Sequence, residues 1–427
     1  MPPARPGAAP PVTSSAAPAS PPCAAPPAWL VAPSRSEAVE LWGLSPEERL
    51  RRSLRQAGVT RIERLGPEER LPLPAGGSLL LFRSDAVYDD RLVRALRDAP
   101  GSLLVAPGPG GGAPGPAVAA HVASERALEA LAALRAPGSG GAPPKGLRVL
   151  APRDLVSSYQ AELRKLEPPF LFPQVHRDDA RRIEDHLFAA SYKGLTDLVT
   201  RWVWPRPAAA LVRALARRRV HPNAVTLASL LLTLLALALF LAGDRGLGLL
   251  AAWLMTFLDT VDGKLARCTL TSSRFGHALD KSLDLLHPPF WWWAFGAGLG
   301  PGTGWATAIA VGGYFAGRIL EGLFLWRFGF EIFSWRPVDA LFRTVVARRN
   351  PNLLLLSVGA LGGRADLGLV MLALWTLGCL GFHGLRVGWA LTLHARGEVI
   401  VPWDEDAPRP RRPMPRAPDG RRKEQAA

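Results

Sequence analysis

The sequence has few cysteines, and the three that it has are scattered at Cys23, Cys268 and Cys379. An odd number of widely separated cysteines without metal-ligand spacing argues against a disulfide framework and a zinc site. The start of the chain also lacks a basic segment followed by an apolar core, which argues against a secretory signal peptide. Residues 1–27 are instead rich in Pro, Ala and Ser. We predict a disordered leader there and expect the mature chain to begin at Met1.

Two glycine-rich stretches, "APGPGGGAPGPA" and "APGSGGAPPKG", lack the features of phosphate-binding loops. Neither leads from a strand directly into a helix with a Lys-Ser/Thr pattern or spaced glycines, so we predict flexible loops. The formal net charge is +15, but no aromatic-plus-basic motif accompanies it. The arginines cluster beside apolar blocks, which indicates contact with anionic lipid surfaces. We therefore expect no nucleic-acid partner.

The composition changes near residue 190, so the two halves of the chain differ in kind. In residues 28–166, short apolar runs such as "SLLLF", "SLLVAP" and "LRVLAP" alternate with helical patterns, which is typical of a soluble α/β, Rossmann-like domain. One helix start is well marked. Ser45 is a cap, Pro46 suits the first helical position, Glu48 completes a capping box, and Gly58 ends the helix. "YDDRLVRALRDA" and "SERALEALAALRA" predict two more helices.

Residues 167–222 are predicted to be a linker that contains a basic amphipathic helix at the membrane surface. Its aromatic side would lie among headgroups and its arginines near lipid phosphates, although an ordinary linker helix is also open. The residues concerned are Trp202, Val203 and Trp204, followed by Arg213, Arg217, Arg218 and Arg219.

Residues 223–395 are predicted to form an all-α transmembrane domain with six spans, and residues 396–427 a disordered basic tail. The expected spans are roughly 223–243, 247–267, 280–300, 304–326, 352–362 with a few further residues, and 367–393. The fifth is barely long enough to cross a bilayer.

The arginines also predict the orientation of these spans. They crowd the segment before the first span, the 327–350 connection and the tail, whereas "GDRG", "GPGTG" and "GGRAD" are nearly charge-balanced. Because cytoplasmic loops carry excess Lys and Arg, we expect both termini to face the cytoplasm, in a bacterial inner membrane. We interpret "VVARRNPN" at 345–352 as an interfacial anchor.

Four aspartates lie in the second and third spans: Asp259, Asp262, Asp280 and Asp284. At about 100° per residue, the first two fall within roughly 60° of each other on one helix face. Asp280 and Asp284, four residues apart, share a face of the next helix. A short connection folds the two helices together, and four carboxylates in one cavity repel one another unless cations neutralise them. All-oxygen ligands favour Mg²⁺ or Mn²⁺, and such ions pair with a diphosphate.

Two glycines and an arginine accompany these acids. Gly263 and Gly276 lack a Cβ and so let a flat base or a diphosphate approach the helix backbone, while Arg267 offers a planar fork of donors to phosphate oxygens. The glycines are equally well explained by helix packing alone.

The spacing Asp259-x-x-Asp262-Gly263-x-x-Ala266-Arg267, eight residues, Gly276-x-x-x-Asp280-x-x-x-Asp284 resembles the complete signature of the CDP-alcohol phosphotransferase (CDP-alcohol phosphatidyltransferase) family. The resemblance covers roughly 190–395 and includes "HPNAVT" at the entry to the first span. It implies six spans, a juxtamembrane helix and a homodimer. It also implies transfer of a phospho-alcohol group from a CDP-linked donor to a second alcohol, with release of CMP.

The resemblance also implies roles for individual residues. Asp259, Asp262 and Asp280 would bind one or two divalent metal ions, and Asp284 would be the catalytic base, with metal ligation by Asp284 also possible. The nucleotide contacts would fall on Asp262, Gly263, Ala266, Arg267 and Gly276. From the residues themselves, a carboxylate at the edge of a metal cluster in a partly dehydrated site is also suited to taking a proton.

Lone arginines within predicted spans need an anion or a polar cavity. Arg318 in "FAGRILEGLF" and Arg386 in "FHGLRVGWA", together with Arg274 and Lys281, are candidates for holding the phosphate of an acceptor such as an inositol phosphate or a glycerol phosphate. Glu321, one turn from Arg318, leaves a structural ion pair equally open.

The stretch "LLLFRSDAVYDDRLVRAL" in the N-terminal domain is similar to the metal-aspartate segment of sugar-phosphate nucleotidyltransferases, with Asp85 at the matching place. The spaced glycines expected after the first strand are absent from "WLVAPSRSEAVELWG". We interpret the domain as a degenerate nucleotidyltransferase-like domain, with an unrelated α/β domain as the alternative.

The sequence as a whole thus predicts a membrane-embedded, Mg²⁺- or Mn²⁺-dependent transferase. The donor would be CDP-diacylglycerol or a soluble CDP-polyol, and the acceptor an alcohol. Membrane lipids would surround the protein. A polyprenyl-diphosphate transferase and a non-catalytic membrane scaffold are the alternatives. Polyprenyl-diphosphate transferases have aspartate-rich motifs without the glycine and arginine pattern seen here. A non-catalytic scaffold would not need every position of the motif.

Overall fold

The computed structural model of the chain describes residues 25–34, 37–73, 76–108, 114–136, 144–160, 162–272 and 274–403. The side chains at 114, 274, 275 and 277–281 lie outside that description. The predicted leader at 1–27 therefore falls almost entirely outside the described residues, as does the predicted tail beyond 403.

The N-terminal region is built on a six-stranded mixed sheet in the order β2-β1-β3-β6-β5-β7. Strand β6 runs antiparallel to both of its neighbours, β3 and β5, and the other pairings are parallel. The strands are β1 (Ala28–Val31), β2 (Ile62–Leu65), β3 (Ser78–Arg83), β5 (Ser102–Pro107), β6 (Pro114–Ala123) and β7 (Arg148–Leu150). The prediction of an α/β domain is confirmed.

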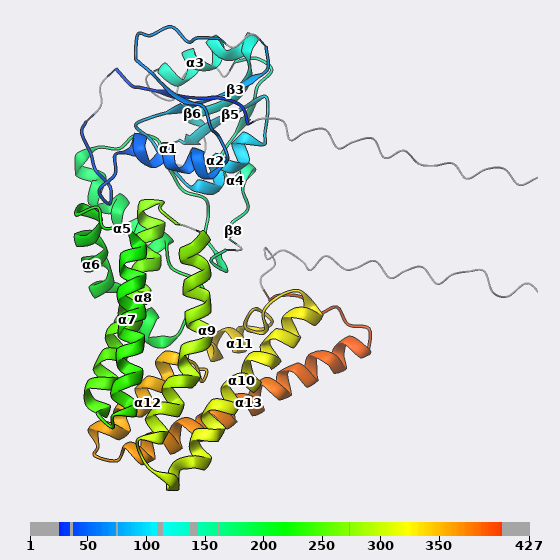
Figure 1. Ribbon diagram of the computed structural model, residues 1–427. Helices are drawn as coiled ribbons and strands as arrows, with labels where there is room; N and C mark the ends of the chain where they lie inside the picture. The colour runs from blue at the N-terminus through cyan, green and yellow to red at the C-terminus, as the bar shows by residue number, and fades with distance from the viewer. Residues whose placement is uncertain are drawn as a thin grey trace, which may run out of the picture.

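Helices cover both faces of this sheet, which explains why its strands are continuous apolar runs. Leu80 and Phe82 of β3 face the helices α1 (Pro46–Gln56) and α2 (Asp90–Arg97). Leu79 and Leu81 face α3 (Ala127–Arg135) on the other side. In Figure 1, α1 and α2 lie between the sheet and the membrane helices, and α3 lies on the far side.

Helix α1 begins where the sequence predicts. The hydroxyl of Ser45 accepts a hydrogen bond of 3.1 Å from the amide of Glu48, and Pro46 is the first helical residue. After the helix, Gly58 takes a positive φ of 84° that favours glycine. The reciprocal half of the predicted capping box differs, because the Glu48 carboxylate accepts from Arg52 at 2.9 Å.

The sequence analysis missed β6. Part of the predicted flexible loop "APGPGGGAPGPA" belongs to this strand, which begins at Pro114. Its sequence, "PGPAVAAHVA", is dominated by Ala, Pro and Gly, which are poor strand formers. The strand is nevertheless central, because both β3 and β5 pair with it.

Smaller elements complete the N-terminal domain and connect it to the C-terminal helices. They are β4 (Val87–Tyr88) paired with β10 (Leu171–Phe172), β8 (Tyr159–Gln160) paired with β9 (Lys165–Leu166), α4 (Pro152–Leu155), α5 (Ala180–Ala190), a π-helical turn at Val199–Val203, α6 (Pro205–Arg217), and short 3₁₀ turns at Ser124–Arg126 and Arg177–Asp179.

A shared apolar core joins the N-terminal region to the membrane helices. Leu41 and Trp42 pack with Leu187 of α5, Val212 of α6 and Val261 of α8 (Arg245–Thr269). A Cβ on Gly43 would lie 2.6 Å from the carbonyl oxygen of α6 residue 216, so only glycine permits this close approach.

Helix α6 and the π-helical turn before it occupy the region of the predicted juxtamembrane helix, and its place at a membrane surface stays a prediction. Trp202 and Val203 are 64% and 53% exposed, as expected of residues that lie among headgroups. Arg213 differs from the prediction. Its guanidinium bonds to Glu184 at 3.1 Å and to Asp185 at 3.2 Å, so it stabilises the junction and is not directed at lipid phosphates.

The C-terminal part is helical, and a helix begins or ends close to each predicted span boundary. The helices are α7 (Pro222–Leu241), α8 (Arg245–Thr269), α9 (Arg274–Ala297), α10 (Gly304–Phe328), α12 (Arg349–Leu361) and α13 (Ala365–Ala395). Between α10 and α12 lies α11 (Pro337–Phe342), and 3₁₀ turns occupy Pro301–Thr303 and Ile332–Ser334.

Three helices in the described part of the chain are long and apolar enough to cross a membrane: Pro222–Leu241, Pro301–Phe328 and Ala365–Ala395. The predicted count of six spans is therefore not confirmed. Helices α8 and α9 carry the acidic motif, which lowers their hydropathy. Helix α12 has 13 residues, which at about 1.5 Å per residue is shorter than a hydrocarbon core of about 30 Å.

Candidate active site

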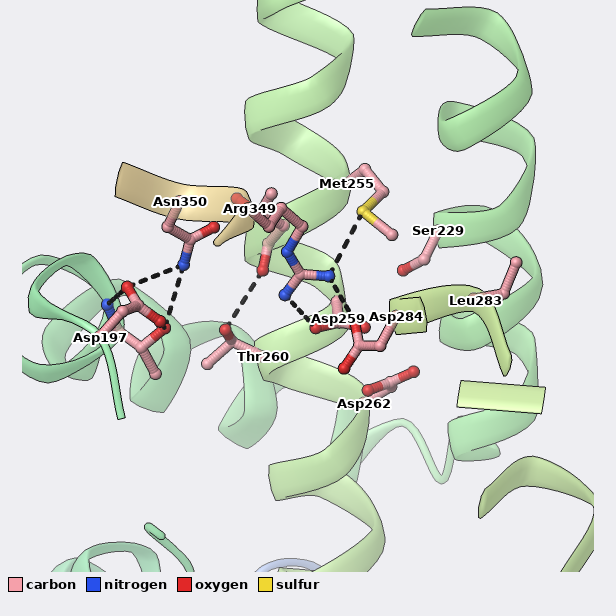
Figure 2. A network of polar contacts seen from close by, with 12 residues as sticks. Asp197, Ser229, Met255, Asp259, Thr260, Asp262, Leu283, Asp284, Arg349 and Asn350 are labelled. Atoms are coloured by element: carbon pink, nitrogen blue, oxygen red, sulfur yellow. Dashed lines mark hydrogen bonds and ion pairs between the residues drawn. The ribbon is translucent and has the colours of Figure 1, made fainter. Parts of the chain in front are cut away.

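Three of the predicted aspartates gather at one place between helices α8 and α9. Asp259 and Asp262 lie one turn apart on α8, and Asp284 reaches the same place from α9 (Figure 2). Asp280 belongs to α9 as well, but its side chain lies outside the described residues. The structure thus brings together the two halves of the motif, as the spacing predicts.

Arg349, the first residue of α12, lies between two of these carboxylates (Figure 2). Its Nη2 donates to Asp259 Oδ2 at 2.6 Å, and its Nη1 donates to Asp284 Oδ1 at 2.7 Å. The interpretation of "VVARRNPN" as an interfacial anchor is therefore wrong for this residue. The sequence concealed its role, because an arginine-rich connection is also what cytoplasmic orientation requires.

The neighbouring Asn350 fixes the start of α12. Its Nδ2 donates to Asp197 Oδ1 at 2.9 Å and to the Thr200 hydroxyl at 3.2 Å. Asp197 in turn accepts from the amides of Val199 and Thr200 at 3.0 and 3.1 Å, which shapes the turn before α6. Since Asn350 is only 3% exposed, this network holds the helix end from which Arg349 reaches the aspartates.

Asp262 is the most buried of the three, with 5% exposure, and a hydroxyl from α7 supports it. Thr226 Oγ1 donates to Asp262 Oδ2 at 2.6 Å. Thr226 lies in the first turns of α7, whose start is set by Pro222 and by the His221 side chain, which accepts from the amide of Asn223 at 3.2 Å. The "HPNAVT" sequence therefore places a hydroxyl beside the motif.

A pair of prolines follows Asp284 on α9. Pro288 and Pro289 cannot donate to the carbonyl oxygens four residues earlier, which belong to Asp284 and Leu285. The Tyr314 hydroxyl of α10 lies 3.2 and 3.1 Å from those two carbonyl oxygens and donates to them. Tyr314 therefore satisfies polar groups that the prolines would otherwise leave exposed within a helix.

Comparison with known proteins relates the part of the chain that carries this site to a protein family. A family model described as CDP-alcohol phosphatidyltransferase matches residues 219–394, which include α7, α8, α9 and Arg349. Residues 219–394 form a CDP-alcohol phosphatidyltransferase domain. Members of this family use divalent metal ions.

Two curated relatives resemble parts of the chain. One is a phosphatidylinositol phosphate synthase of Mycobacteroides abscessus, 32% identical over 111 residues, which are 24% of this chain and 50% of the relative. The other is an archaetidylinositol phosphate synthase of Pyrococcus horikoshii, 36% identical over 81 residues, 19% of this chain and 43% of the relative. The chain thus spans about half the length of the curated relatives it matches.

Four of the five predicted nucleotide-contacting residues of the CDP-alcohol phosphatidyltransferase domain lie along one stretch of α8. Asp262, Gly263, Ala266 and Arg267 occupy its last turns, and Gly276 lies at the start of α9. A Cβ on Gly263 would come within 3.1 Å of Arg267 Nη2, so the guanidinium lies across the glycine. A side chain at this position would contact the guanidinium of Arg267, so the glycine leaves room for it.

The residues of the domain fit a divalent cation in their chemistry. Within the described residues no three His, Cys, Asp or Glu side chains are already arranged as metal ligands, and Asp280 is not among those described. Asp259 and Asp284 do share a cation in the form of the Arg349 guanidinium, which shows that this position favours positive charge. Carboxylate oxygens are the donors that Mg²⁺ and Mn²⁺ prefer.

Of the four residues predicted for an acceptor phosphate, the two whose side chains are described, Arg318 and Arg386, pair with different acids. Arg318 forms an ion pair with Glu321, the structural alternative left open by the sequence, and Arg348 bonds the same carboxylate at 2.6 Å. Arg386 makes two bonds of 2.6 and 2.5 Å to Asp339, and this pair is almost completely buried. The side chains of Arg274 and Lys281 lie outside the described residues.

Asp85, the predicted metal-aspartate of the N-terminal domain, is already paired. Arg83 donates to its two carboxylate oxygens at 3.0 and 2.7 Å, and both side chains are largely buried. The resemblance of this domain to nucleotidyltransferases stays a prediction, since the matched residues 219–394 do not include it.

Proposed function

We propose that the chain is a membrane-embedded CDP-alcohol phosphotransferase. It transfers a phosphatidyl or phospho-polyol group from a CDP-linked donor to an acceptor alcohol and releases CMP. One observation carries the proposal. Carboxylates from two helices converge at the residues that the family motif specifies, and a single guanidinium lies between two of them. Carboxylates gathered this closely repel one another, and a divalent cation bound among them would reduce that repulsion.

Asp259, Asp262, Asp280 and Asp284 are the residues that would hold one or two Mg²⁺ or Mn²⁺ ions. When bound, such ions neutralise a diphosphate and stabilise the charge on its leaving group. Asp262 is held by Thr226, so its orientation is fixed before substrate binds. The guanidinium of Arg267, which lies across Gly263, is placed to bind phosphate oxygens of the nucleotide.

Asp284 is the base in this proposal. Its side chain is 49% exposed, whereas that of Asp259 is 15% exposed, so an incoming hydroxyl reaches Asp284 more readily. The acceptor oxygen bonds to the phosphorus of the donor, its proton passes to the Asp284 carboxylate, and the bond between that phosphorus and the CMP oxygen breaks. CMP leaves with the electron pair of that bond.

The names of the relatives guide the proposal for the acceptor. One is a phosphatidylinositol phosphate synthase and the other an archaetidylinositol phosphate synthase, which favours a phosphorylated polar alcohol such as an inositol phosphate. Arg318 remains a candidate for holding its phosphate, and the structure adds Arg348, because both guanidinium groups converge on Glu321 beside Tyr314. Arg274 and Lys281 belong to the same proposal. Arg386 is already bound by Asp339 and is the weakest of the predicted group.

We further propose that the domain lies in a bacterial inner membrane with the site at the cytoplasmic face, and that it forms a homodimer. The position of the N-terminal α/β domain beside the end of α8 supports a cytoplasmic site, because that end also carries the motif (Figure 1).

The test is a product assay with the purified full chain in lipid nanodiscs. CDP-diacylglycerol and CDP-inositol are offered as donors, inositol phosphate and glycerol phosphate as acceptors, each with Mg²⁺ or Mn²⁺. We expect CMP and a new phosphodiester of matching mass with one donor. A lipid product with CDP-diacylglycerol alone would identify the donor. If a correctly folded protein released no CMP with either donor, the proposal would be wrong.

A further inference from the structure

The C-terminal end of α8 is bound by side chains of the N-terminal domain. Three consecutive carbonyl oxygens at this end, those of Cys268, Thr269 and Leu270, accept hydrogen bonds from α1. The donors are Arg49 Nη1 at 2.6 Å, Arg52 Nη1 at 2.8 Å and Gln56 Nε2 at 3.0 Å, in the same order. The residues that donate and those that accept are more than 200 positions apart in the sequence, since Arg49 and Cys268 differ by 219.

These carbonyls need such partners because of how α8 ends. A helix leaves its last four carbonyls without partners in the helix itself. Here the amides of Leu270 and Thr271 both donate to the carbonyl of Ala266, and Leu270 adopts a left-handed φ of 52°. The chain turns away at this point. The carbonyl oxygens of Cys268, Thr269 and Leu270 therefore accept hydrogen bonds from outside α8. Helix α1 supplies them.

The arrangement on α1 is specific in spacing and in charge. Arg49, Arg52 and Gln56 are three and four residues apart, so they occupy one face of the helix. Two guanidinium groups meet the C-terminal end of α8, where the aligned peptide dipoles place partial negative charge. Arg49 is only 6% exposed, so its bond to Cys268 is shielded from water.

We propose that α1 is a capping element for α8, and that the N-terminal domain thereby positions Ala266 and Arg267 at the nucleotide site. Both residues lie in the last turn of α8, directly before the capped carbonyls. If that turn unwinds, the Arg267 guanidinium loses its place across Gly263. The capping itself follows from the contacts, and only its effect on the nucleotide rests on the proposed function.

This assigns the N-terminal domain a role that needs no active site of its own. Arg49, Arg52 and Gln56 act through α8 and are positioning residues. Arg51 provides a matched control on the same helix, because it donates to Glu47 at 3.1 Å and to the carbonyl oxygen of Ile62 at 3.2 Å, both within the N-terminal domain.

The test compares the double variant Arg52→Ala/Gln56→Ala with Arg51→Ala, in the full chain in nanodiscs. Hydrogen exchange is measured on peptides that contain the amides of Leu270 and Thr271. We expect these amides to exchange about tenfold faster in the double variant, since bonds that hold the helix end are lost, and at the wild-type rate in Arg51→Ala. Arg49→Lys, which keeps the charge but loses the planar fork, should give a smaller increase.

A second readout separates positioning from general destabilisation. CDP binding with Mn²⁺ present should weaken in the double variant, and in turnover the KM for the CDP-linked donor should rise by a larger factor than kcat falls. Unchanged exchange at Leu270 and Thr271 in both the double variant and Arg49→Lys would overturn the capping role. Faster exchange with unchanged CDP affinity would overturn the link to the nucleotide site. Because exchange needs no substrate, it decides the capping role even if the chain transfers no phospho-alcohol group.

Discussion

The carboxylates of the N-terminal domain and those of the membrane domain are neutralised in different ways. In the N-terminal domain, Asp85 pairs with Arg83 and Asp89 pairs with Arg91, each two residues away in the sequence. In the membrane domain, Asp259 and Asp284 share Arg349, which is 90 and 65 residues away. The first arrangement balances each charge locally. The second brings acids from two helices to one shared guanidinium.

The difference shows which acids are available for chemistry. Asp85 and Asp89 each have an arginine of their own, so neither needs a further cation. In the membrane domain the third carboxylate, Asp262, accepts from the neutral hydroxyl of Thr226, so this contact does not balance its charge. Carboxylates in a largely dry environment are costly without neutralisation, and a fold keeps them when they bind something. The following predictions test that contrast, from the largest expected effect to the smallest.

Removing one acid from each region should affect activity in one region only. Asp284→Asn should reduce CMP release by about 10²–10⁴-fold, the usual contribution of a general base, while the protein stays folded. Asp85→Asn should leave CMP release unchanged, because Asp85 only balances Arg83. Initial rates of CMP release from equal amounts of folded protein are the measurement. Full activity in Asp284→Asn would remove its assignment as the base, and a large loss in Asp85→Asn would make the N-terminal domain catalytic.

The Arg386–Asp339 pair should behave as a structural pair despite its place near the membrane. Both side chains are almost fully buried, and the guanidinium lies 4.2 Å from the ring centroid of Trp335 and 4.6 Å from that of Trp389. Arg386→Ala or Asp339→Ala alone should destabilise the protein by about 3–5 kcal/mol, since each leaves a buried charge without its partner. Denaturant unfolding in detergent measures this, with the double variant as control. A double variant as costly as the two single changes added together would argue against a direct pair.

Removing Arg349 should strengthen metal binding in the absence of substrate. Arg349→Gln frees Asp259 and Asp284 from a competing cation, so Mn²⁺ affinity should rise about tenfold, the equivalent of one charged hydrogen bond. Electron paramagnetic resonance of free Mn²⁺ gives the affinity. Arg364→Gln, which removes a surface arginine paired with Asp366, is the matched control. Weaker Mn²⁺ binding in Arg349→Gln would mean that Arg349 supports the site and does not compete for it.

The smallest effect concerns His121 of strand β6. Burial lowers the pKa of its imidazole below the ordinary value of 6.5. Below about pH 6.5 the unfolded chain therefore binds a proton that the folded domain does not, and stability falls as the pH falls. His121→Asn should remove this part of the pH dependence between pH 7 and pH 5. Thermal unfolding at several pH values measures it, and an unchanged slope in the variant would assign the dependence to other groups.

The sequence predicts those features of the structure that depend on neighbouring residues, such as helix starts and the residues that share a helix face. Ser45 and Pro46 mark the start of α1, and residue spacing alone places Asp259 and Asp262 on one face of α8. The meeting of those residues with Asp284 also follows from a short connection between two helices.

The rest depends on contacts that side-chain patterns do not encode. Arg349 comes from a distant segment whose arginines have a second explanation in membrane orientation. Arg49 and Arg52 donate to backbone carbonyl oxygens, which every residue carries. The residue types in α8 therefore do not predict these hydrogen bonds. The alanine-rich strand β6 is held by its neighbours β3 and β5 and has little strand propensity of its own.

The most direct measurement is a Mn²⁺ titration of the full chain, with and without CDP, in the wild type and in Asp259→Asn. If acids of α8 and α9 hold a cation that binds a diphosphate, the wild type should take up one or two Mn²⁺ ions saturably, CDP should tighten that uptake, and Asp259→Asn should abolish it. The account is contradicted if the wild type takes up no Mn²⁺ even with CDP present, or if Asp259→Asn binds the ion as tightly as the wild type does.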